Sequence, residues 1–313
     1  MKNVILFLVL ILIFLTGGCQ NIQPNSHVIT SKGELGIIDD RALHRLFGKK
    51  VKDLVEKGNY VSGETLISQL KRTSCVLEVP SAIGEKMTPS EIYRESMSKV
   101  IMLGRAYRCP KKCKKIHWSV ASGVVIRSDG IVVTNYHVVN SEADTIMMAA
   151  MTRDGKMYAV REVLAANKKS DVAILKLEGA EGLKAASIKV DEPVGNPVTV
   201  ISHPNRRYFL LTHGYVSRYY FNKDRACFMN ITANYAKGSS GGPLFNNHGE
   251  LIGLVSSTTS LSSNHLALNH QDGREKKIGE KSKGQEKMVI QQGHQMTLKN
   301  CVPSRSIMAL IKK

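Results

Sequence analysis

From about residue 99 onward, the chain consists of short apolar runs separated by turns. The runs 124–126 and 131–133 flank the tripeptide Ser128-Asp129-Gly130, which is typical of a β-hairpin turn. Further strands are expected at 157–164, 172–175, 198–201, 209–211, 227–231, 251–255, 288–290 and 296–298. Many short strands with glycine-rich turns between them predict closed or sandwiched all-β units.

The segment before residue 99 has helical periodicity instead. Apolar residues fall on one face of the segment 41–57, and a shorter helix is expected at 65–71. Thr88-Pro89-Ser90-Glu91 reads as a capping box with proline at the first helical position. After a polar tether, the region 19–97 is therefore predicted to be a small, mostly helical accessory region that serves as a spacer or packing collar.

The first residues predict export. Lys2 precedes an unbroken apolar run at 4–15, which is too short for a membrane-spanning helix and typical of a signal peptide, here 1–18. Small residues before Cys19 resemble a bacterial lipobox, although Thr16 stands where the lipobox is apolar. We expect a lipid on Cys19 that anchors the protein to a bacterial membrane, on its periplasmic or cell-surface side. The alternative is an ordinary signal with a chance cysteine.

Charge narrows the possible partners. The chain has 44 Lys and Arg against 26 Asp and Glu, a net charge of +18. That balance favours acidic proteins, nucleic acid or anionic membranes, but no nucleic-acid-binding motif is present, so nucleic acid is not a predicted partner. A basic run at 105–115 could contact anionic lipid or an acidic partner, or form a solvated face. The stretch 263–287, charged and poor in apolar residues over most of its length, predicts a flexible surface loop.

Three segments carry the residue types that acyl-transfer chemistry needs. His137 follows one apolar strand, Asp171 precedes another, and Ser240 lies within the run 238–244, Gly-Ser-Ser-Gly-Gly-Pro-Leu. A serine hydroxyl becomes nucleophilic when an imidazole accepts its proton, and a carboxylate orients that imidazole. Glycines beside the serine allow a tight turn that points two backbone N–H groups at an oxyanion. These three residues are the candidate catalytic groups.

In these segments the chain resembles trypsin-like serine peptidases of the chymotrypsin fold, and within them the compact bacterial Deg/Htr-like branch. The resemblance spans roughly 99–311 and includes the run 122–126, Ser-Gly-Val-Val-Ile. It implies two antiparallel six-stranded β-barrels, at about 98–180 and 190–313, with a helix at 304–311. It also implies a serine endopeptidase that forms an acyl-enzyme on protein or peptide substrates and needs no cofactor and no metal.

The resemblance assigns further residues. It makes Ser240 the nucleophile, His137 the general base, and Asp171 its orienting carboxylate. The backbone N–H groups of Gly238 and Ser240 would form the oxyanion hole. The substrate pocket would have Asn234 at its base and a wall formed by Leu254, Val255 and Ser256. A pocket without a carboxylate predicts cleavage after small or medium uncharged residues, because an unpaired buried cation is costly.

Three more expectations rest on the resemblance. Cys227 and Cys301 would lie on neighbouring antiparallel strands and form a disulfide. Ser239 stands where digestive members of the family have an aspartate that pairs with a freshly cut N-terminus, so activation by cleavage near Lys99 is not expected. The chain reaches Lys313 just after the expected final helix, so we expect no peptide-binding PDZ module.

Two alternatives stay open. Cys109, Cys113 and His117 could begin a zinc site with Cys75 as a fourth ligand, or the cysteines could form a disulfide. His203 and His213 are read as structural. The rival function is a surface lipoprotein that uses a protease-like fold only to bind a partner.

Overall fold

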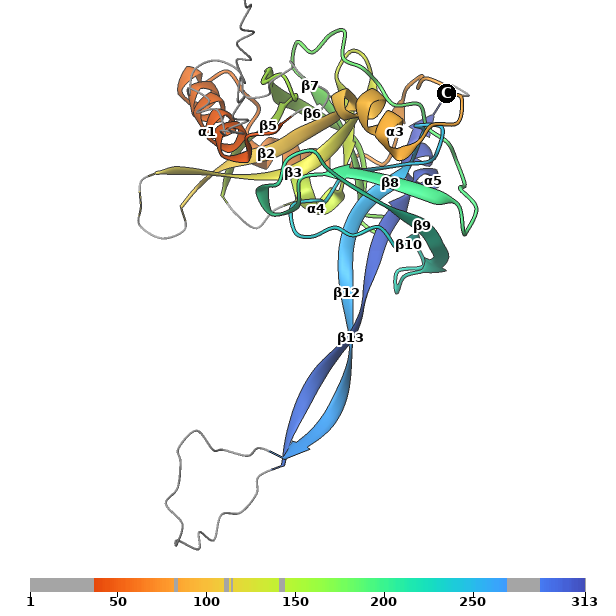
Figure 1. Cartoon of the computed structure of the whole chain (residues 1–313). Coiled ribbons are helices and arrows are strands. Elements are labelled where there is room, and N and C mark those ends of the chain that lie inside the picture. The colour runs from red at the N-terminus through yellow and green to blue at the C-terminus, as the bar shows by residue number, and fades with distance from the viewer. Residues whose placement is uncertain are drawn as a thin grey trace, which may run out of the picture.

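The computed structural model describes residues 37–81, 84–109, 113, 115–140, 144–268 and 288–312. The signal 1–18 and Cys19 lie outside these residues. Two closed antiparallel barrels of six strands form the body, as predicted for the all-β fold (Figure 1). Strands of the first barrel are β2 (Val100–Arg108), β3 (Ile116–Arg127), β4 (Ile131–Thr134), β5 (Thr145–Met151), β6 (Met157–Asn167) and β7 (Val172–Leu177).

The second barrel closes in the order β10-β13-β12-β11-β8-β9. Its strands are β8 (Pro197–Ser202), β9 (Leu210–Phe221), β10 (Cys227–Ile231), β11 (Pro243–Phe245), β12 (Leu251–Leu268) and β13 (Met288–Pro303). Each barrel has an apolar interior: Leu103, Val132 and Leu175 are buried in the first, and Val200 and Leu244 in the second. The two interiors hold separate clusters of side chains, as expected for two barrels that each bury one face of their strands.

Strand β2 is buried on both of its faces, because helices cover the outside of the first barrel. Val100 and Met102 face outward from the barrel and are as fully buried as Ile101 and Leu103. The helix over β2 is α1 (Asp40–Lys57). Helix α2 (Gly63–Gln69) contacts β5 and β6 of the same barrel, and α3 (Pro89–Ser96), which leads into a 3-10 turn (Met97–Lys99), contacts β8 of the second barrel. A strand covered on both faces reads as a continuous apolar run, which hides its alternation.

Helix α1 is fixed to the first barrel by large side chains in close contact. Asp39 caps the helix by accepting a hydrogen bond from Ala42 N at 2.8 Å, and Gly58 ends it at φ +71°. Phe47 is fully buried against β2 at Gly104, where a Cβ atom would lie 2.6 Å from the Phe47 ring. We refer to the described helical segment 40–99, whose helices pack on the barrels, as the collar.

The collar also joins the two ends of the described chain. The short strand β1 (Cys75–Val76) pairs in parallel with β14 (Ile311–Lys312). The C-terminal helix expected at 304–311 is shorter than predicted, because α5 (Ser304–Met308) ends at Met308 and Ile311 already belongs to β14. Among the described helices, none combines the length and the apolar character that crossing a bilayer requires.

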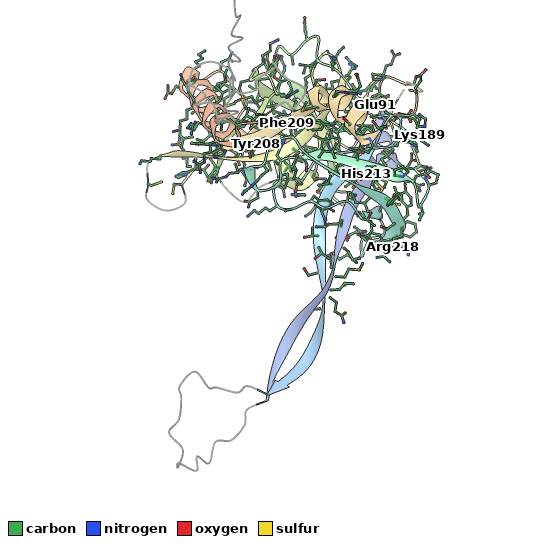
Figure 2. All side chains as sticks on the ribbon, in the orientation of Figure 1. Glu91, Lys189, Tyr208, Phe209, His213 and Arg218 are labelled. Carbon is green, nitrogen blue, oxygen red and sulfur yellow. The ribbon has the colours of Figure 1, made fainter. Side chains whose placement is uncertain are left out.

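A long two-stranded ribbon leaves the second barrel (Figure 1). It consists of β12 and β13, whose register runs from Gly253↔Pro303 out to Leu268↔Met288. Of the predicted flexible loop 263–287, residues 263–268 belong to β12 instead, and residues 269–287 lie outside the described residues. Figure 2 shows Tyr208 and Phe209 within the body, and Arg218 near the base of the ribbon.

The predicted Cys227–Cys301 disulfide is wrong in this structure. Cys301 lies opposite Met229 in the β10–β13 register, two residues from Cys227, and both thiols are free. The Cys301 sulfur is buried beside the hydroxyl of Tyr235 at 3.7 Å instead. Burial raises the pKa of Cys301 to about 12, which keeps the thiol protonated and unreactive.

Candidate active site

The three candidate catalytic residues meet between the barrels. His137 lies in α4 (Tyr136–Val139) just after β4, Asp171 immediately precedes β7, and Ser240 precedes β11 in the second barrel. His137 Nδ1 lies 2.9 Å from each carboxylate oxygen of Asp171, and His137 Nε2 lies 2.9 Å from Ser240 Oγ. Because a carboxylate only accepts hydrogen bonds, Nδ1 carries the ring hydrogen and Nε2 accepts from the serine hydroxyl.

Asp171 is held from three sides. Its Oδ1 accepts the backbone N–H of His137 at 3.1 Å, and its Oδ2 accepts the hydroxyl of Ser256 at 2.6 Å. The side chain of Asn135 donates to the backbone carbonyl of Asp171 at 3.0 Å. The side chain of Asp171 is 16% exposed and that of His137 is 48% exposed, so the carboxylate is sheltered and the imidazole is open to substrate.

Ser256 reaches Asp171 because of a β-bulge. The register of β12 and β13 shifts between Val255, opposite Cys301, and Ser257, opposite Asn300. Ser256 is the extra residue, and a bulge of this kind re-aims the side chain it carries. Sequence reasoning placed Ser256 only in the pocket wall and missed its contact with Asp171, since nothing in the local sequence marks a bulge.

The loop around Ser240 needs glycine at two positions. Gly238 has φ +97° and a Cβ there would lie 2.7 Å from the carbonyl oxygen of His203. Gly241 has φ +78° and a Cβ there would lie 2.2 Å from the carbonyl oxygen of Ser122. Both the backbone angle and the close approach exclude a side chain. The glycines of this motif thus shape the turn that presents the hydroxyl of Ser240.

Ser122 of β3 links the first barrel to this loop. Its backbone N–H donates to the carbonyl of Ser240 at 2.9 Å, and its hydroxyl lies 3.3 Å from the carbonyl oxygen of Gly238. The backbone N–H groups of Gly238 and Ser240 donate no hydrogen bond to any atom of the described residues. Two donors beside the hydroxyl are therefore free to bind an oxyanion.

His203 links β2 of the first barrel to the segment that precedes β9 in the second. The ring is fully buried: Nε2 donates to the carbonyl of Ile101 at 3.1 Å, and Nδ1 accepts the N–H of Phe209 at 3.0 Å. Burial lowers the pKa of His203 to about 4, so the ring is neutral at pH 7. The structural role expected for His203 agrees with these contacts.

A small cavity of about 60 Å³ opens beside Ser240. Of the predicted pocket residues, Val255 and Ser256 line it, whereas Leu254 is buried in the core and Asn234 is exposed outside it. Tyr235 lines the cavity in place of its neighbour Asn234. The hydroxyl of Tyr235 is tied down at 2.7 Å from the carbonyl of Asn300. No Asp or Glu lines the cavity among the described residues.

A much larger groove, of about 1020 Å³, also includes Ser240 in its lining. Helix α1, strands β2 and β3, and the loop at 205–207 form its walls. No sequence motif predicts this groove, because its residues come from distant parts of the chain. Its charged lining residues are Asp40, Arg41, Arg45, Arg105, Arg206, Arg207 and Lys237.

The comparisons with known sequences agree with this geometry. A family model described as a trypsin-like peptidase domain matches residues 121–254. A "probable periplasmic serine endoprotease DegP-like" from Ectopseudomonas mendocina (strain ymp) is 36% identical over 155 residues, covering 48% of this chain and 32% of that protein. A protein of the same name from Pseudomonas putida (strain GB-1) is 32% identical over 188 residues, covering 56% and 38%. The chain spans about a third of the length of these curated relatives.

Solved structures show the same fold. The HtrA-type protease AlgW with a decapeptide superposes with a TM-score of 0.51 at 18% identity, covering 72% of this chain and 66% of that chain. A variant of AlgW with a tripeptide gives a TM-score of 0.51 at 17% identity, covering 71% and 62%. At such identities the likeness concerns the arrangement of the two barrels.

Proposed function

We propose that the protein is a serine endopeptidase that cleaves protein substrates, because residues 121–254 match a trypsin-like peptidase domain and its relatives and structural neighbours are DegP-like and HtrA-type proteases. One observation carries the proposal: a continuous line of hydrogen bonds joins Asp171, His137 and Ser240, next to two unused backbone donors. Binding a partner does not require this arrangement, whereas acyl transfer does.

In the proposed reaction, Ser240 Oγ attacks the substrate carbonyl carbon while His137 Nε2 accepts the hydroxyl proton. The N–H groups of Gly238 and Ser240 stabilise the oxyanion that forms. His137 then gives its proton to the leaving amine, which breaks the peptide bond and leaves an acyl-enzyme on Ser240. Water, activated by the same imidazole, releases the acid and restores the serine. Asp171 stabilises the protonated imidazole of His137 during both acylation and hydrolysis of the acyl-enzyme.

A fluorophosphonate probe tests the assignment directly. The native protein should be labelled covalently at Ser240, and Ser240→Ala should not be labelled at all. A fully folded native protein that stays unlabelled would favour the rival function, a surface lipoprotein that binds a partner without catalysis. Ser239→Ala is the matched control, since it changes a neighbouring hydroxyl and should keep the labelling.

We also propose that the protein is exported and held on a membrane by a lipid on Cys19. The signal-like run 1–18 supports this, and relatives at 32–36% identity carry the word periplasmic in their names. Expression with a radiolabelled fatty acid should label the wild type and leave Cys19→Ser unlabelled. Equal labelling of both, or of neither, would contradict lipidation at Cys19.

A further inference from the structure

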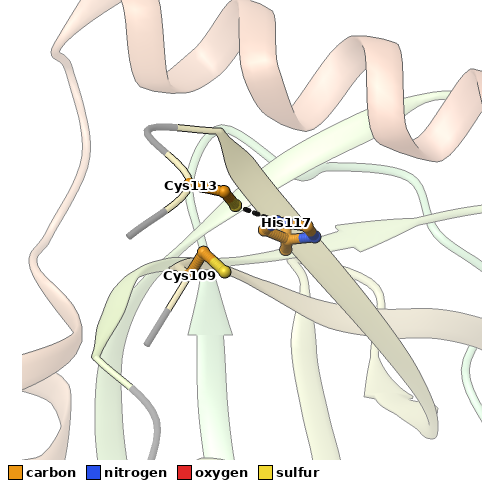
Figure 3. A group of neighbouring side chains, drawn as sticks. All are labelled: Cys109, Cys113 and His117. Carbon is orange, nitrogen blue, oxygen red and sulfur yellow. Dashed lines mark hydrogen bonds between the residues drawn. The ribbon is translucent and has the colours of Figure 1, made fainter. Parts of the chain in front are cut away.

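Cys109, Cys113 and His117 converge at the end of the β2–β3 hairpin (Figure 3). Cys109 directly follows β2 and His117 is the second residue of β3. One ligand atom of each residue lies within 4.8 Å of the other two, and Cys113 Sγ is 3.1 Å from His117 Nε2. Neither Cys109 nor Cys113 forms a disulfide in the described structure.

From this convergence we propose that the three residues bind a zinc ion. Zinc is bound at about 2.3 Å by thiolates and about 2.0 Å by imidazole, so ligand atoms in a tetrahedral site lie about 3.4–3.8 Å apart. The three atoms reach that geometry by small side-chain movements. On binding, the cysteine thiols lose their protons and each sulfur donates an electron pair, with no change of oxidation state.

The position of His117 favours a zinc site over a simple disulfide between the two cysteines. A Cys109–Cys113 disulfide does not require a histidine beside it, whereas a zinc site does use a ring nitrogen close to both sulfurs, as His117 provides. The His117 ring is also oriented from outside the cluster, since Tyr107 stacks on it with 5.8 Å between ring centroids. Cys75 is not a fourth ligand: it lies in β1, and its thiol contacts the carbonyl of Leu310 at 3.7 Å. The fourth position is therefore left to water or to a group from another molecule.

Cobalt binding to the reduced, full-length protein tests the site. One equivalent of Co²⁺ should bind and show the thiolate-to-cobalt charge-transfer absorption of a tetrahedral sulfur site, and Zn²⁺ should displace it. Cys113→Ser and His117→Ala should reduce Zn²⁺ affinity at least about tenfold, the scale of losing a metal contact. Cys75→Ser, a cysteine outside the cluster, should bind as the wild type does.

Two results would overturn the zinc site. One is the absence of the charge-transfer band in the reduced wild type, or its survival at full strength in Cys113→Ser. The other is a Cys109–Cys113 disulfide that forms in air even with one equivalent of Zn²⁺ bound. Thermal unfolding of each variant shows whether it folds, so that lost binding is not mistaken for lost structure.

The large groove carries a second inference independently, because its charges are unbalanced. Six cationic side chains line it against one carboxylate, that of Asp40, which already accepts the N–H of Tyr208 at 2.8 Å. None of the six forms an ion pair within the described residues. Arg105 Nε is buried and has no hydrogen-bond partner among them. Crowded, unpaired cations of this kind attract carboxylates.

Resting on the proposed function, we infer that this groove binds acidic residues of the substrate. We assign the small cavity to the residue before the cut, and the larger groove, which includes both His137 and Ser240, to the residues that follow it. Lipid or nucleic acid would also supply negative charge. A groove that opens onto the nucleophile favours an acidic peptide as its occupant.

Two matched peptides test this inference. They share the residues before the cut and carry either three Glu or three Lys after it. The Glu peptide should have a kcat/KM at least about tenfold higher at low ionic strength, and the ratio should shrink with added salt. Arg45→Glu should reduce the ratio. Lys49→Glu, which makes the same charge change on the same helix outside the groove, should leave it near the wild-type value.

The experiment distinguishes failure of the groove inference from failure of the proposed peptidase function. Equal cleavage of both peptides by protein whose Ser240 reacts with the fluorophosphonate probe would overturn the groove inference alone. No cleavage and no labelling would overturn the proposed function and the groove inference with it. Tighter binding of single-stranded nucleic acid than of the Glu peptide to Ser240→Ala, lost in Arg45→Glu, would also overturn the acidic-peptide assignment.

Discussion

The hydroxyl of Ser256 donates a hydrogen bond to Asp171 Oδ2 over 2.6 Å, so a bulge residue of the second barrel holds the carboxylate of the first. Asp171 and His137 belong to the first barrel and Ser240 to the second. This contact therefore fixes the carboxylate relative to the nucleophile as well as to the imidazole. The position of the two barrels relative to each other is part of the site.

Removing that contact should slow catalysis without abolishing it. A hydrogen bond to a charged group contributes about 1.5–3 kcal/mol, so Ser256→Ala should lower kcat about 10–100-fold if the bond is fully used in the transition state. Asp171 would keep its two bonds from His137. Steady-state kinetics with a peptide substrate measure the loss. Ser257→Ala, the next residue of β12, is the control, and an equal loss there would contradict the special role of Ser256.

Loss of the nucleophile should be far more severe. Ser240→Ala should reduce hydrolysis by about ten-thousand-fold or more, the scale seen when a triad member is removed. The substitution removes a single hydroxyl and leaves the packing of the loop unchanged. The unfolding temperature should therefore stay near the wild-type value. Peptide hydrolysis and thermal unfolding measured on one preparation check both statements. More than a few percent of residual activity would rule out Ser240 as the nucleophile.

Acid should destabilise the protein through His203. Its folded-state pKa of about 4 lies below the ordinary value near 6.5, so between these values the unfolded chain binds a proton that the folded chain excludes. The contribution of neutral His203 to the unfolding free energy is therefore complete above pH 6.5 and is lost as the pH falls toward 4. At pH 5 this one group should cost about 2 kcal/mol of unfolding free energy relative to pH 7.

Urea unfolding at pH 7 and pH 5 measures this loss. His203→Gln, which can still donate and accept a hydrogen bond, should unfold with a smaller difference between the two pH values. His213→Gln, at an exposed position on β9, is the control. An identical difference in all three proteins would show that His203 is not responsible.

The residue before the cut should be small or medium in size and uncharged. The cavity beside Ser240 holds about 60 Å³, and Tyr235, Val255 and Ser256 line it without a carboxylate. A lysine or arginine there would be desolvated with no partner. Cleavage of a peptide library, read by mass spectrometry, gives the profile. A preference for Lys or Arg at this position would refute the assignment of the cavity.

Activation by cleavage near Lys99 should not be needed. Ser239, the residue before the nucleophile, is buried and accepts the hydroxyl of Ser202 at 3.0 Å, so it presents no charge to a new N-terminus. Full-length protein made uncleavable around Lys99 should turn over substrate. A form that starts at Lys99 lacks Leu43 and Phe47, which are fully buried, and should unfold at a lower temperature. An inert full-length form beside an active trimmed form would reverse this reading.

The sequence predicts the fold well where the pattern is local. Apolar periodicity locates α1, a capping box locates α3, and the turn around Gly130 locates the hairpin of β3 and β4. β2 and β5 were missed, because burial on both faces removes the alternation that marks a strand. The disulfide failed for a related reason: a two-residue offset between Cys227 and Cys301 is set by the whole barrel.

Site residues divide in the same way. His137, Asp171 and Ser240 lie in recognisable segments, and the structure brings them together. The groove could not be foreseen, since Arg45, Arg105 and Arg206 come from three distant segments. Net charge alone signalled an acidic partner, without saying where it would bind.

The ribbon that leaves the second barrel starts next to the active site, because Ser256 lies at its base. β12 stays paired with β13 from the bulge at Ser256 out to Leu268, with a second register shift between Leu261 and Ser262. Sliding one strand past the other by a single residue would turn each side chain to the opposite face. Such a slip would have to move or erase the bulge, and Ser256 would then release Asp171. A molecule that binds the ribbon and shifts its register as far as Ser256 would therefore remove one hydrogen bond from the carboxylate of the triad.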